Sequence, residues 1–149
     1  MAAITKFEDI EAWQQARALA GKVYALCRTG ELSRDWGLRD QMQRAAVSVM
    51  ANIAEGFGRQ GRKELIQFLK IARGSCTEVQ SPLYLAMDAE LLTAEQFSEA
   101  QAKAARTGRK ISAFINYLVR LERDGDTKSV RDDWSIYAPD LTDPPTNNQ

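Results

Sequence analysis

The sequence contains no histidine and only two cysteines among its 149 residues. The absence of histidine removes the commonest general base and a common zinc ligand. It also excludes the Glu-x-x-His pairs that build di-metal sites in helical bundles. The cysteines are not spaced for zinc, and Ser75 and Cys76 have no candidate base beside them. No enzymatic activity and no cofactor or metal are therefore expected, and an enzyme that uses only Glu, Arg and Lys is the remaining alternative.

The formal net charge is zero, because the chain has 20 basic and 20 acidic residues. The overall charge therefore gives no indication of nucleic-acid binding. The charges are unevenly distributed, however. Residues 39–73 include seven basic and three acidic residues, whereas residues 123–149 include three basic residues and six aspartates. The middle of the chain is thus basic and its end is acidic.

Uncharged apolar runs of membrane-spanning length are missing as well. The amino terminus lacks the basic and then apolar pattern of a signal peptide. Cys27 and Cys76 lie within apolar helical patterns, which favours two buried thiols over a disulfide. These features predict a soluble cytoplasmic protein, and the chain length predicts one domain.

What the sequence does contain is apolar residues at three- and four-residue steps, the spacing of amphipathic helices. Four helices are predicted and no segment has the pattern of a strand. The helices begin near Phe7 or Asp9, near Gly37 or Leu38, near Arg62 and after Thr93, and the last ends near Arg123. The fold class is therefore all-α, an antiparallel up-down-up-down four-helix bundle over residues 1–123. Residues 124–149 are expected to form an acidic, proline-containing C-terminal arm.

Local signals indicate where the helices begin. Thr5–Glu8 fits a capping box, with Asp9 as an alternative cap. Asp35 or Ser33 is expected to cap the second helix, since a short side-chain oxygen satisfies first-turn N–H groups. Thr93–Gln96 fits a capping box for the fourth helix.

Glycine and proline mark the other boundaries. Gly56 and Gly58 are expected to end the second helix, because glycine readily adopts the left-handed backbone beyond a helix end. Gly61 occupies the cap position of the third helix. Pro82 is expected to kink this helix rather than to end it, because Leu83 and the apolar residues after it keep the register.

A polar stripe along the second helix is the most informative pattern. It consists of Gln41, Arg44, Ser48, Asn52 and Glu55, and Arg59 continues it. Short uncharged polar residues such as Ser48 and Asn52 have poor helix propensity in mid-helix. A tight contact with another helix or subunit, with hydrogen bonds across it, would explain them, and so would a ligand groove. The contact is the favoured interpretation.

Five basic residues surround the end of the second helix and the start of the third: Arg59, Arg62, Lys63, Lys70 and Arg73. They are the candidate nucleic-acid contacts, because many phosphate contacts together give a salt-sensitive affinity. An ordinary solvated helix face is the simpler interpretation of such a charge run. A phosphate-cradling loop is not indicated, since the Walker pattern and its preceding strand are missing.

The predicted arm includes Trp134, Ile136, Tyr137 and Leu141, side chains that are unusual in a fully solvated tail. They are expected to dock on the bundle or on a neighbouring subunit. Trp13, in the first helix, is expected in the core or in a subunit interface, and an aromatic ligand platform is the alternative.

Several segments resemble the four-helix-bundle proteins named after the intervening sequences of bacterial 23S ribosomal RNA genes. The matching segments are Phe7–Ile10 with Trp13–Gln14 and Ala16, Gly37–Leu38 with Gln41, Arg44–Ser48, Ala51–Gly56, and Glu64 with Phe68–Leu69 and Ile71–Ser75. The resemblance covers residues 7–121. Gly61 stands where the family usually has serine, Pro82 is unusual for it, and the arm lies outside it.

The resemblance implies a four-helix bundle that assembles into a ring-shaped homo-oligomer, expected to be a pentamer. The related accessory variability proteins of diversity-generating retroelements resemble basic rings that bind nucleic acid and a reverse transcriptase, and they are more basic than this chain. The family has no established enzymatic activity. The expected function is therefore a non-enzymatic homo-oligomer that binds RNA or DNA through the basic residues between the second and third helices. The alternative is a protein-interaction scaffold or adaptor with no nucleic-acid role.

Overall fold

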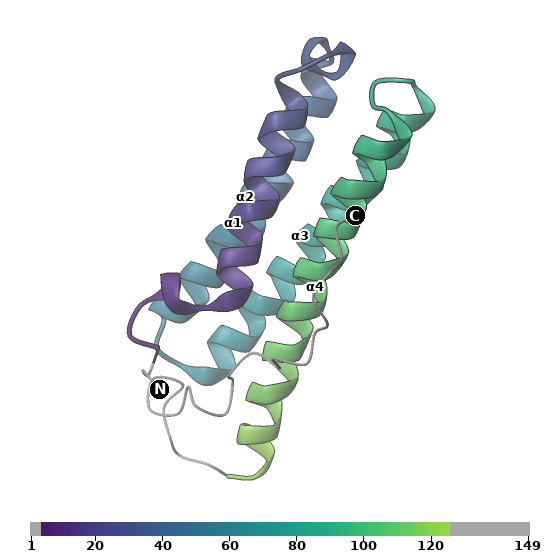
Figure 1. The fold of residues 1–149 in the computed structure, drawn as a ribbon. Helices are drawn as coiled ribbons and strands as arrows, with labels where there is room; N and C mark the ends of the chain where they lie inside the picture. Colours follow the sequence, from purple (N-terminus) through teal and green to yellow (C-terminus); the bar gives the residue numbers. More distant parts are fainter. Residues whose placement is uncertain (1–3, 126–149) are drawn as a thin grey trace.

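The computed structural model describes residues 4–125, which are all-α and contain no strand (Figure 1). The elements are, in order, the short 3₁₀ helix η1 (Phe7–Asp9), α1 (Glu11–Cys27), the 3₁₀ helix η2 (Glu31–Arg34), α2 (Trp36–Gly58), α3 (Arg62–Asp88) and α4 (Ala94–Arg123). The α-helices lie side by side, and α1 contacts α2 and α4 while α3 contacts α2 and α4. The predicted four-helix bundle is thus confirmed.

The connections lie at the two ends of the bundle (Figure 1). Helix η2, between α1 and α2, and residues 89–93, between α3 and α4, lie at one end. We call this end, which has two of the connections, the connection end. Residues 59–61 and the last turn of α4 lie at the other end. The predicted C-terminal arm, including the expected docking of Trp134, Ile136, Tyr137 and Leu141, lies outside the described residues.

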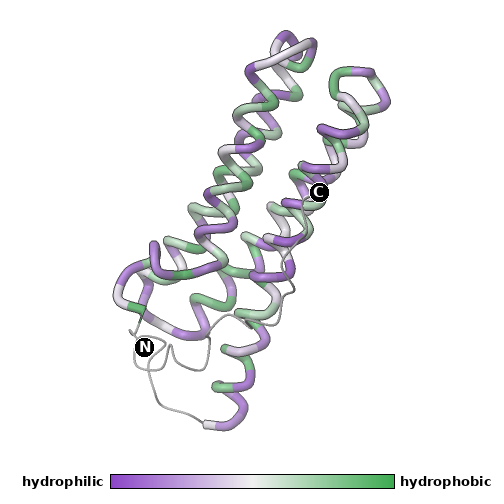
Figure 2. Tube along the Cα trace, viewed as in Figure 1, coloured by the Kyte–Doolittle hydropathy of each residue, from purple (hydrophilic) through white to green (hydrophobic). Residues whose placement is uncertain are grey.

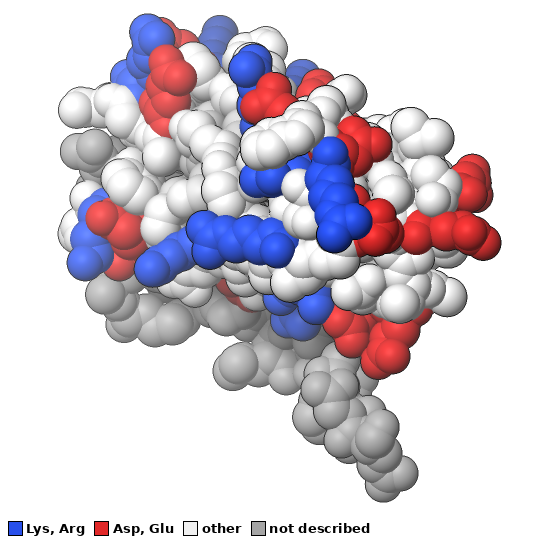
Figure 3. Space-filling model, turned by 90° about the horizontal axis from the view of Figure 1, so that it is seen from above, with Lys and Arg blue, Asp and Glu red and all other residues white. Residues whose placement is uncertain are grey.

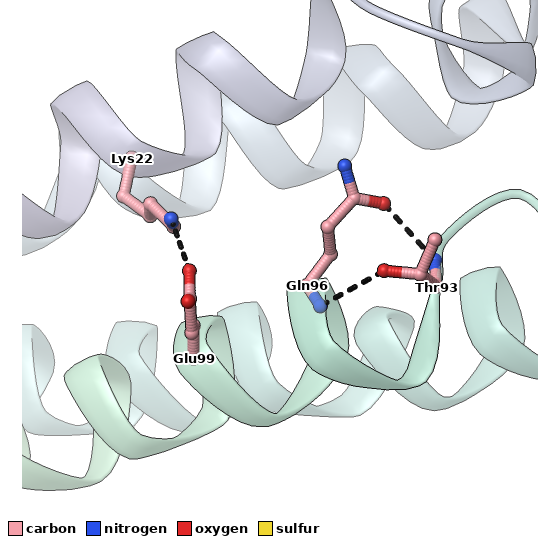
Figure 4. Close-up of polar contacts among 4 residues, drawn as sticks. All are labelled: Lys22, Thr93, Gln96 and Glu99. Carbon is pink, nitrogen blue, oxygen red and sulfur yellow. Dashed lines mark hydrogen bonds and ion pairs between the residues drawn. The ribbon is translucent and has the colours of Figure 1, made fainter. Parts of the chain in front are cut away.

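Side-chain caps start two of the helices. The Asp35 carboxylate accepts a hydrogen bond from the Leu38 N–H at 3.0 Å, so Asp35 is the cap of α2. At the start of α4, the Gln96 N–H donates to Thr93 Oγ1 at 3.1 Å and the Thr93 N–H donates to Gln96 Oε1 at 3.0 Å (Figure 4). These bonds satisfy N–H groups at the helix start. The capping box predicted at Thr93 is confirmed.

The capping box predicted at Thr5–Glu8 is wrong. The carboxylate that closes this turn belongs to Asp9, which accepts hydrogen bonds from the N–H groups of Thr5 and Lys6 at 3.2 and 3.3 Å. The result is the separate helix η1, and α1 begins only after Ile10, without a side-chain cap. Ile10 is fully buried, so core packing holds the start of α1 in place.

Helix α2 ends at Gly58, as predicted, but Gly56 lies within the helix and neither glycine has the expected left-handed backbone. The left-handed residue beyond the helix is Gln60, with a φ of 66°. A Cβ atom at Gly56 would lie 2.6 Å from Phe68 Cβ and 3.2 Å from Leu65 Cδ1, whereas one at Gly58 would meet nothing within 4 Å. Gly56 therefore permits the close approach of α2 and α3.

Helix α3 continues through Pro82, as predicted. Leu83 and Ala86, which follow the proline, are fully buried, so the apolar register is kept. Proline has no N–H group, and residue 82 therefore cannot donate to the Glu78 carbonyl one turn earlier. The loss of one hydrogen bond is tolerated because the helix is anchored by burial on both sides of it.

Each α-helix contributes to one core. Polar and apolar residues alternate along every helix (Figure 2). Leu19 of α1, Met42 of α2, Leu69 of α3 and Phe114 of α4 are all fully buried. Trp13 is buried as well and belongs to this cluster, so its core interpretation is confirmed.

Both cysteines are buried free thiols, as predicted. Burial raises the pKa of Cys76 from 9.0 to about 12. Burial also raises the pKa of Cys27, and the nearby positive charge of Arg39 opposes this effect. The thiolate forms, which are the reactive ones, are therefore disfavoured in the folded protein.

We expect neither thiol of the folded protein to react with a disulfide reagent at pH 8, whereas both should react promptly in denaturant. Because the folded pKa of Cys76 lies above its ordinary value, the unfolded chain loses this proton first. The free energy of unfolding should therefore fall as the pH rises from 9.0 to about 12. Thiol titration and urea denaturation measure the two effects, and rapid labelling in native buffer would contradict the burial.

Candidate nucleic-acid interface

The middle of the polar stripe lies in the contact between α2 and α3. Ser48 Oγ is 2.9 Å from Oγ of Ser75, which is buried. The Asn52 side-chain amide donates to Ser48 Oγ at 3.0 Å and to the Ser48 carbonyl at 2.8 Å. These polar groups thus form hydrogen bonds with one another, in place of hydrogen bonds to water, where α2 and α3 are close together. Short polar side chains suit this contact because longer ones would hold the helices apart.

We expect Ser75→Ala to lower the free energy of unfolding by about 1 kcal/mol relative to Ser81→Ala. The first substitution removes one of the two side-chain partners of the Ser48 hydroxyl and leaves Asn52 as the other. Ser81 is exposed on the same helix and carries the same gain in helix propensity. Urea denaturation of both variants measures the difference. Equal stabilities would mean that the Ser48–Ser75 bond contributes nothing.

The ends of the stripe are exposed and charged. Arg44 Nε lies 3.0 Å from an Asp40 carboxylate oxygen, and Arg59 Nη2 lies 3.0 Å from a Glu55 oxygen. Gln41 is exposed one residue after Asp40. A shallow hollow of about 480 Å³ lies between α2 and α3, lined by Gly37, Asp40, Gln41, Arg44, Ala45, Ser48 and Glu78. Its rim has charges of both signs, so it gives no selectivity for an anion.

Two of the five predicted basic residues are engaged within the fold. Arg62 Nη1 lies 3.5 Å from Glu122 Oε1 of α4, and the Arg62 side chain is only 12% exposed. The Arg59 guanidinium pairs with Glu55 and lies over the Phe68 ring, 5.4 Å from its centre. Arg59 therefore connects the end of α2 to α3, and Arg62 connects the start of α3 to the end of α4.

The other three, Lys63, Lys70 and Arg73, are exposed along α3. Steps of seven and three residues keep them on one side of the helix. Arg73 Nη1 donates to Ser112 Oγ of α4 at 3.5 Å. This side of α3 therefore borders α4 at the level of Ser112.

Helix α4 adds basic residues that sequence reasoning missed. These are Arg109 and Arg120, which are exposed. With the exposed Asn116 between them, they follow steps of seven and four residues, which place all three on one side of α4. Arg109 precedes Ser112 by less than one turn, so this side adjoins Arg73. The spacing was visible in the sequence, but which faces of α3 and α4 adjoin is a tertiary property.

The exposed cations of the two helices form one surface. We call Lys63, Lys70, Arg73, Arg109 and Arg120 the α3–α4 basic face. Residues 62–77 and 105–123, from which it is built, contain nine basic and two acidic residues. One of the acidic residues, Glu122, is paired with Arg62. The face is therefore predominantly positive, and its Lys and Arg donors suit phosphate oxygens.

Not every basic residue of α4 belongs to this face. Lys110 Nζ lies 3.1 Å from Glu11 Oε1, on the side of α4 that contacts α1. On the same side, Lys22 Nζ lies 2.7 Å from Glu99 Oε2 (Figure 4). The hydrogen bond and charge of Lys22 lower the pKa of Glu99. These pairs join α1 to α4, so Lys22 and Lys110 do not belong to the α3–α4 basic face.

The connection end has charges of both signs. Figure 3 shows this end from above, where blue and red atoms intermingle and red atoms gather toward one edge. Exposed Asp88, Glu90 and Glu95 flank the α3–α4 connection, whereas Arg28 and Arg34 flank the α1–α2 connection. A mixed surface of this kind does not attract a polyanion.

The described residues 4–125 contain no arrangement suited to metal chemistry. No three of their His, Cys, Asp or Glu side chains are grouped so that they could hold a metal ion. Over the same range, no helix has both the length and the apolarity required to cross a membrane.

Residues 4–125 thus form an all-α bundle with a positive surface along α3 and α4. The family model for the 23S rRNA-intervening sequence protein matches residues 8–113. The chain belongs to this family, and the resemblance seen in the sequence is confirmed.

A solved structure supports the fold. It is a protein with unknown function from the S23 ribosomal protein family of Bacteroides thetaiotaomicron VPI-5482. The two chains superpose with a TM-score of 0.64 at 21% sequence identity, over 70% of this chain and 97% of the other. The comparison with curated proteins finds no match.

Proposed function

We propose that this protein is a non-enzymatic, homo-oligomeric binding protein whose α3–α4 basic face contacts the phosphate backbone of RNA or DNA. The observation that carries the proposal is the gathering of exposed cations from two helices on one outer surface. Compared with the residues predicted from the sequence, Arg109 and Arg120 replace Arg59 and Arg62, which pair with carboxylates.

The proposed binding is independent of nucleotide sequence. Long, flexible Lys and Arg side chains reach phosphate oxygens, which repeat along every strand. Lys63 and Arg73 are about 15 Å apart along the axis of α3, so one chain contacts only a few phosphates. Each contact is weak by itself, and repetition of the face in an oligomer raises the affinity through multivalency.

The proposal includes a ring-shaped homo-oligomer of up-down-up-down bundles in the cytoplasm, a pentamer as the resemblance implies. Contacts between consecutive helices and the short connections support the order of the helices. Exposed Val47 on α2 and Ile71 on α3 support a contact between subunits. Light scattering at micromolar concentration measures the solution mass, and a monomer would overturn the ring.

Fluorescence anisotropy with a structured RNA and a duplex DNA tests the proposed function. We expect saturable binding of both at low salt, with a Kd below about 10 µM, and a loss of affinity as salt rises. Similar affinities for unrelated sequences are expected, because the contacts are to the backbone. Absence of salt-dependent binding in this range would overturn the nucleic-acid role.

A protein-interaction scaffold is the second candidate, and a different surface favours it. Trp36 is 74% exposed, and Tyr84 and Leu85 are exposed as well, in the parts of α2 and α3 nearest the connection end. Large exposed apolar side chains often mark protein contacts. A pull-down from host lysate separates the candidates: a partner retained after nuclease treatment favours the scaffold, and a partner lost with nuclease favours nucleic acid.

A further inference from the structure

We propose that the acidic stretch around Asp132 and Asp133 occupies the α3–α4 basic face of the same chain and competes there with nucleic acid. The competition rests on the proposed function, whereas the docking does not. Three observations carry the docking: the place where the described chain ends, the charges of the two partners, and the length of chain between them.

The described chain ends beside the face. Helix α4 ends at Arg123, less than one turn after Arg120. The ion pair between Arg62 and Glu122, at 3.5 Å, holds the last turn of α4 against the first turn of α3, where Lys63 lies. The segment that follows Gly125 therefore starts at one end of the basic face.

The charges are complementary. Residues 126–149 contain five aspartates and two basic residues, and Asp132 and Asp133 form an adjacent pair followed by Trp134. The basic face supplies cations for these carboxylates. It also offers an apolar contact, because Val119 is 46% exposed on α4 and lies two turns after Ser112, on the edge that adjoins α3. The connection end, with charges of both signs, offers no comparable attraction (Figure 3).

The length of the chain permits the contact. The segment from Gly125 to Asp132 spans up to about 25 Å when extended, whereas Lys63 and Arg73 are about 15 Å apart. Asp132 and Asp133 can therefore reach Lys70 and Arg73. Exposed ion pairs are weak individually, but a short tether supplies an effective concentration of about a millimolar, which favours the intramolecular contact.

Cross-linking of the full-length chain tests the docking without nucleic acid. Asn116→Cys, on the outer side of α4, is combined with Ser135→Cys and treated with a short bismaleimide; the native thiols are buried and do not compete. The control combines Ser135→Cys with Ala18→Cys, an exposed position on α1. We expect an intramolecular cross-link at least fivefold more abundant with Asn116→Cys, and less abundant in high salt.

Two results would overturn the docking. Equal yields at Asn116 and Ala18 would mean that the arm has no preferred site. Cross-linked species of twice the chain mass would mean that a second copy supplies the acidic stretch. Both outcomes are read from mass spectra and need no knowledge of the natural partner.

Anisotropy with the same RNA tests the competition. Asp132→Asn combined with Asp133→Asn should raise the affinity about three- to tenfold at low salt, because the face becomes more accessible. Asp140→Asn combined with Asp143→Asn changes the net charge equally and should have a smaller effect. Equal effects would overturn the competition. A cross-link without any RNA binding would overturn the competition and the proposed function but not the docking.

Discussion

Gly56→Ala is expected to lower the free energy of unfolding by about 2 kcal/mol, although alanine is the better helix former. The added Cβ would lie 2.6 Å from Phe68 Cβ. Because Phe68 Cβ is attached directly to the backbone, rotation of the side chain cannot relieve the overlap. Helices α2 and α3 must move apart instead, which weakens the contact that Ser48 and Ser75 form farther along the same helices. Urea denaturation, with the slope checked for two-state behaviour, measures the loss.

Gly58→Ala is the matched control, because it makes the same substitution in the last turn of the same helix. A Cβ there meets nothing within 4 Å, so only the gain in helix propensity remains. We expect the stability to stay the same or to rise by up to about 1 kcal/mol. If both variants behaved alike, Gly56 would not be the point of close approach.

Removing four of the five cations of the α3–α4 basic face is expected to weaken binding of RNA and duplex DNA by tenfold or more at low salt. The variant replaces Lys70, Arg73, Arg109 and Arg120 with Gln, so that several phosphate contacts are lost together. Its helices should form normally, because exposed substitutions change stability by less than about 0.5 kcal/mol each. Anisotropy gives the affinities, and a thermal melt followed by circular dichroism confirms that the bundle is intact.

A second fourfold variant controls for net charge. It replaces Arg17, Arg28, Arg34 and Arg44 with Gln, at exposed positions on α1, on α2 and near the connection end. The two variants lose the same charge from different surfaces. We expect the control to weaken binding less than threefold. Equal losses would mean that overall charge, and not the α3–α4 basic face, governs the affinity.

Local sequence signals predicted the fold because they act within one or two helical turns. The three- and four-residue spacing of apolar residues located every α-helix. The Thr93–Gln96 capping box and the Asp35 cap each need only residues that are close in sequence, and both are present. The Thr5–Glu8 box failed because Asp9, a neighbouring carboxylate, takes the same N–H donors.

Features that depend on contact between helices were not predictable in the same way. Gly56 has the local signature of a helix end, yet its requirement for glycine comes from Phe68 on another helix. Arg62 resembles a solvated residue in the sequence, yet Glu122, near the end of α4, pairs with it.

The candidate interface was predictable only in part, for the same reason. Lys63, Lys70 and Arg73 could be assigned to one side of a helix from their spacing. Arg109 and Arg120 join them only because α3 and α4 adjoin along that edge, as the Arg73–Ser112 bond shows. Pairing of helix faces is a tertiary property, and the charge count along the chain did not contain it.

The salt dependence of binding tests the central claim most directly. The logarithm of the binding constant for a duplex is plotted against the logarithm of the salt concentration for wild type and for the variant that lacks four cations of the α3–α4 basic face. The account predicts a straight line with a negative slope for wild type, and a slope smaller in magnitude by about one for each phosphate-contacting cation removed. Identical slopes for the two proteins, or a wild-type slope near zero, would contradict it.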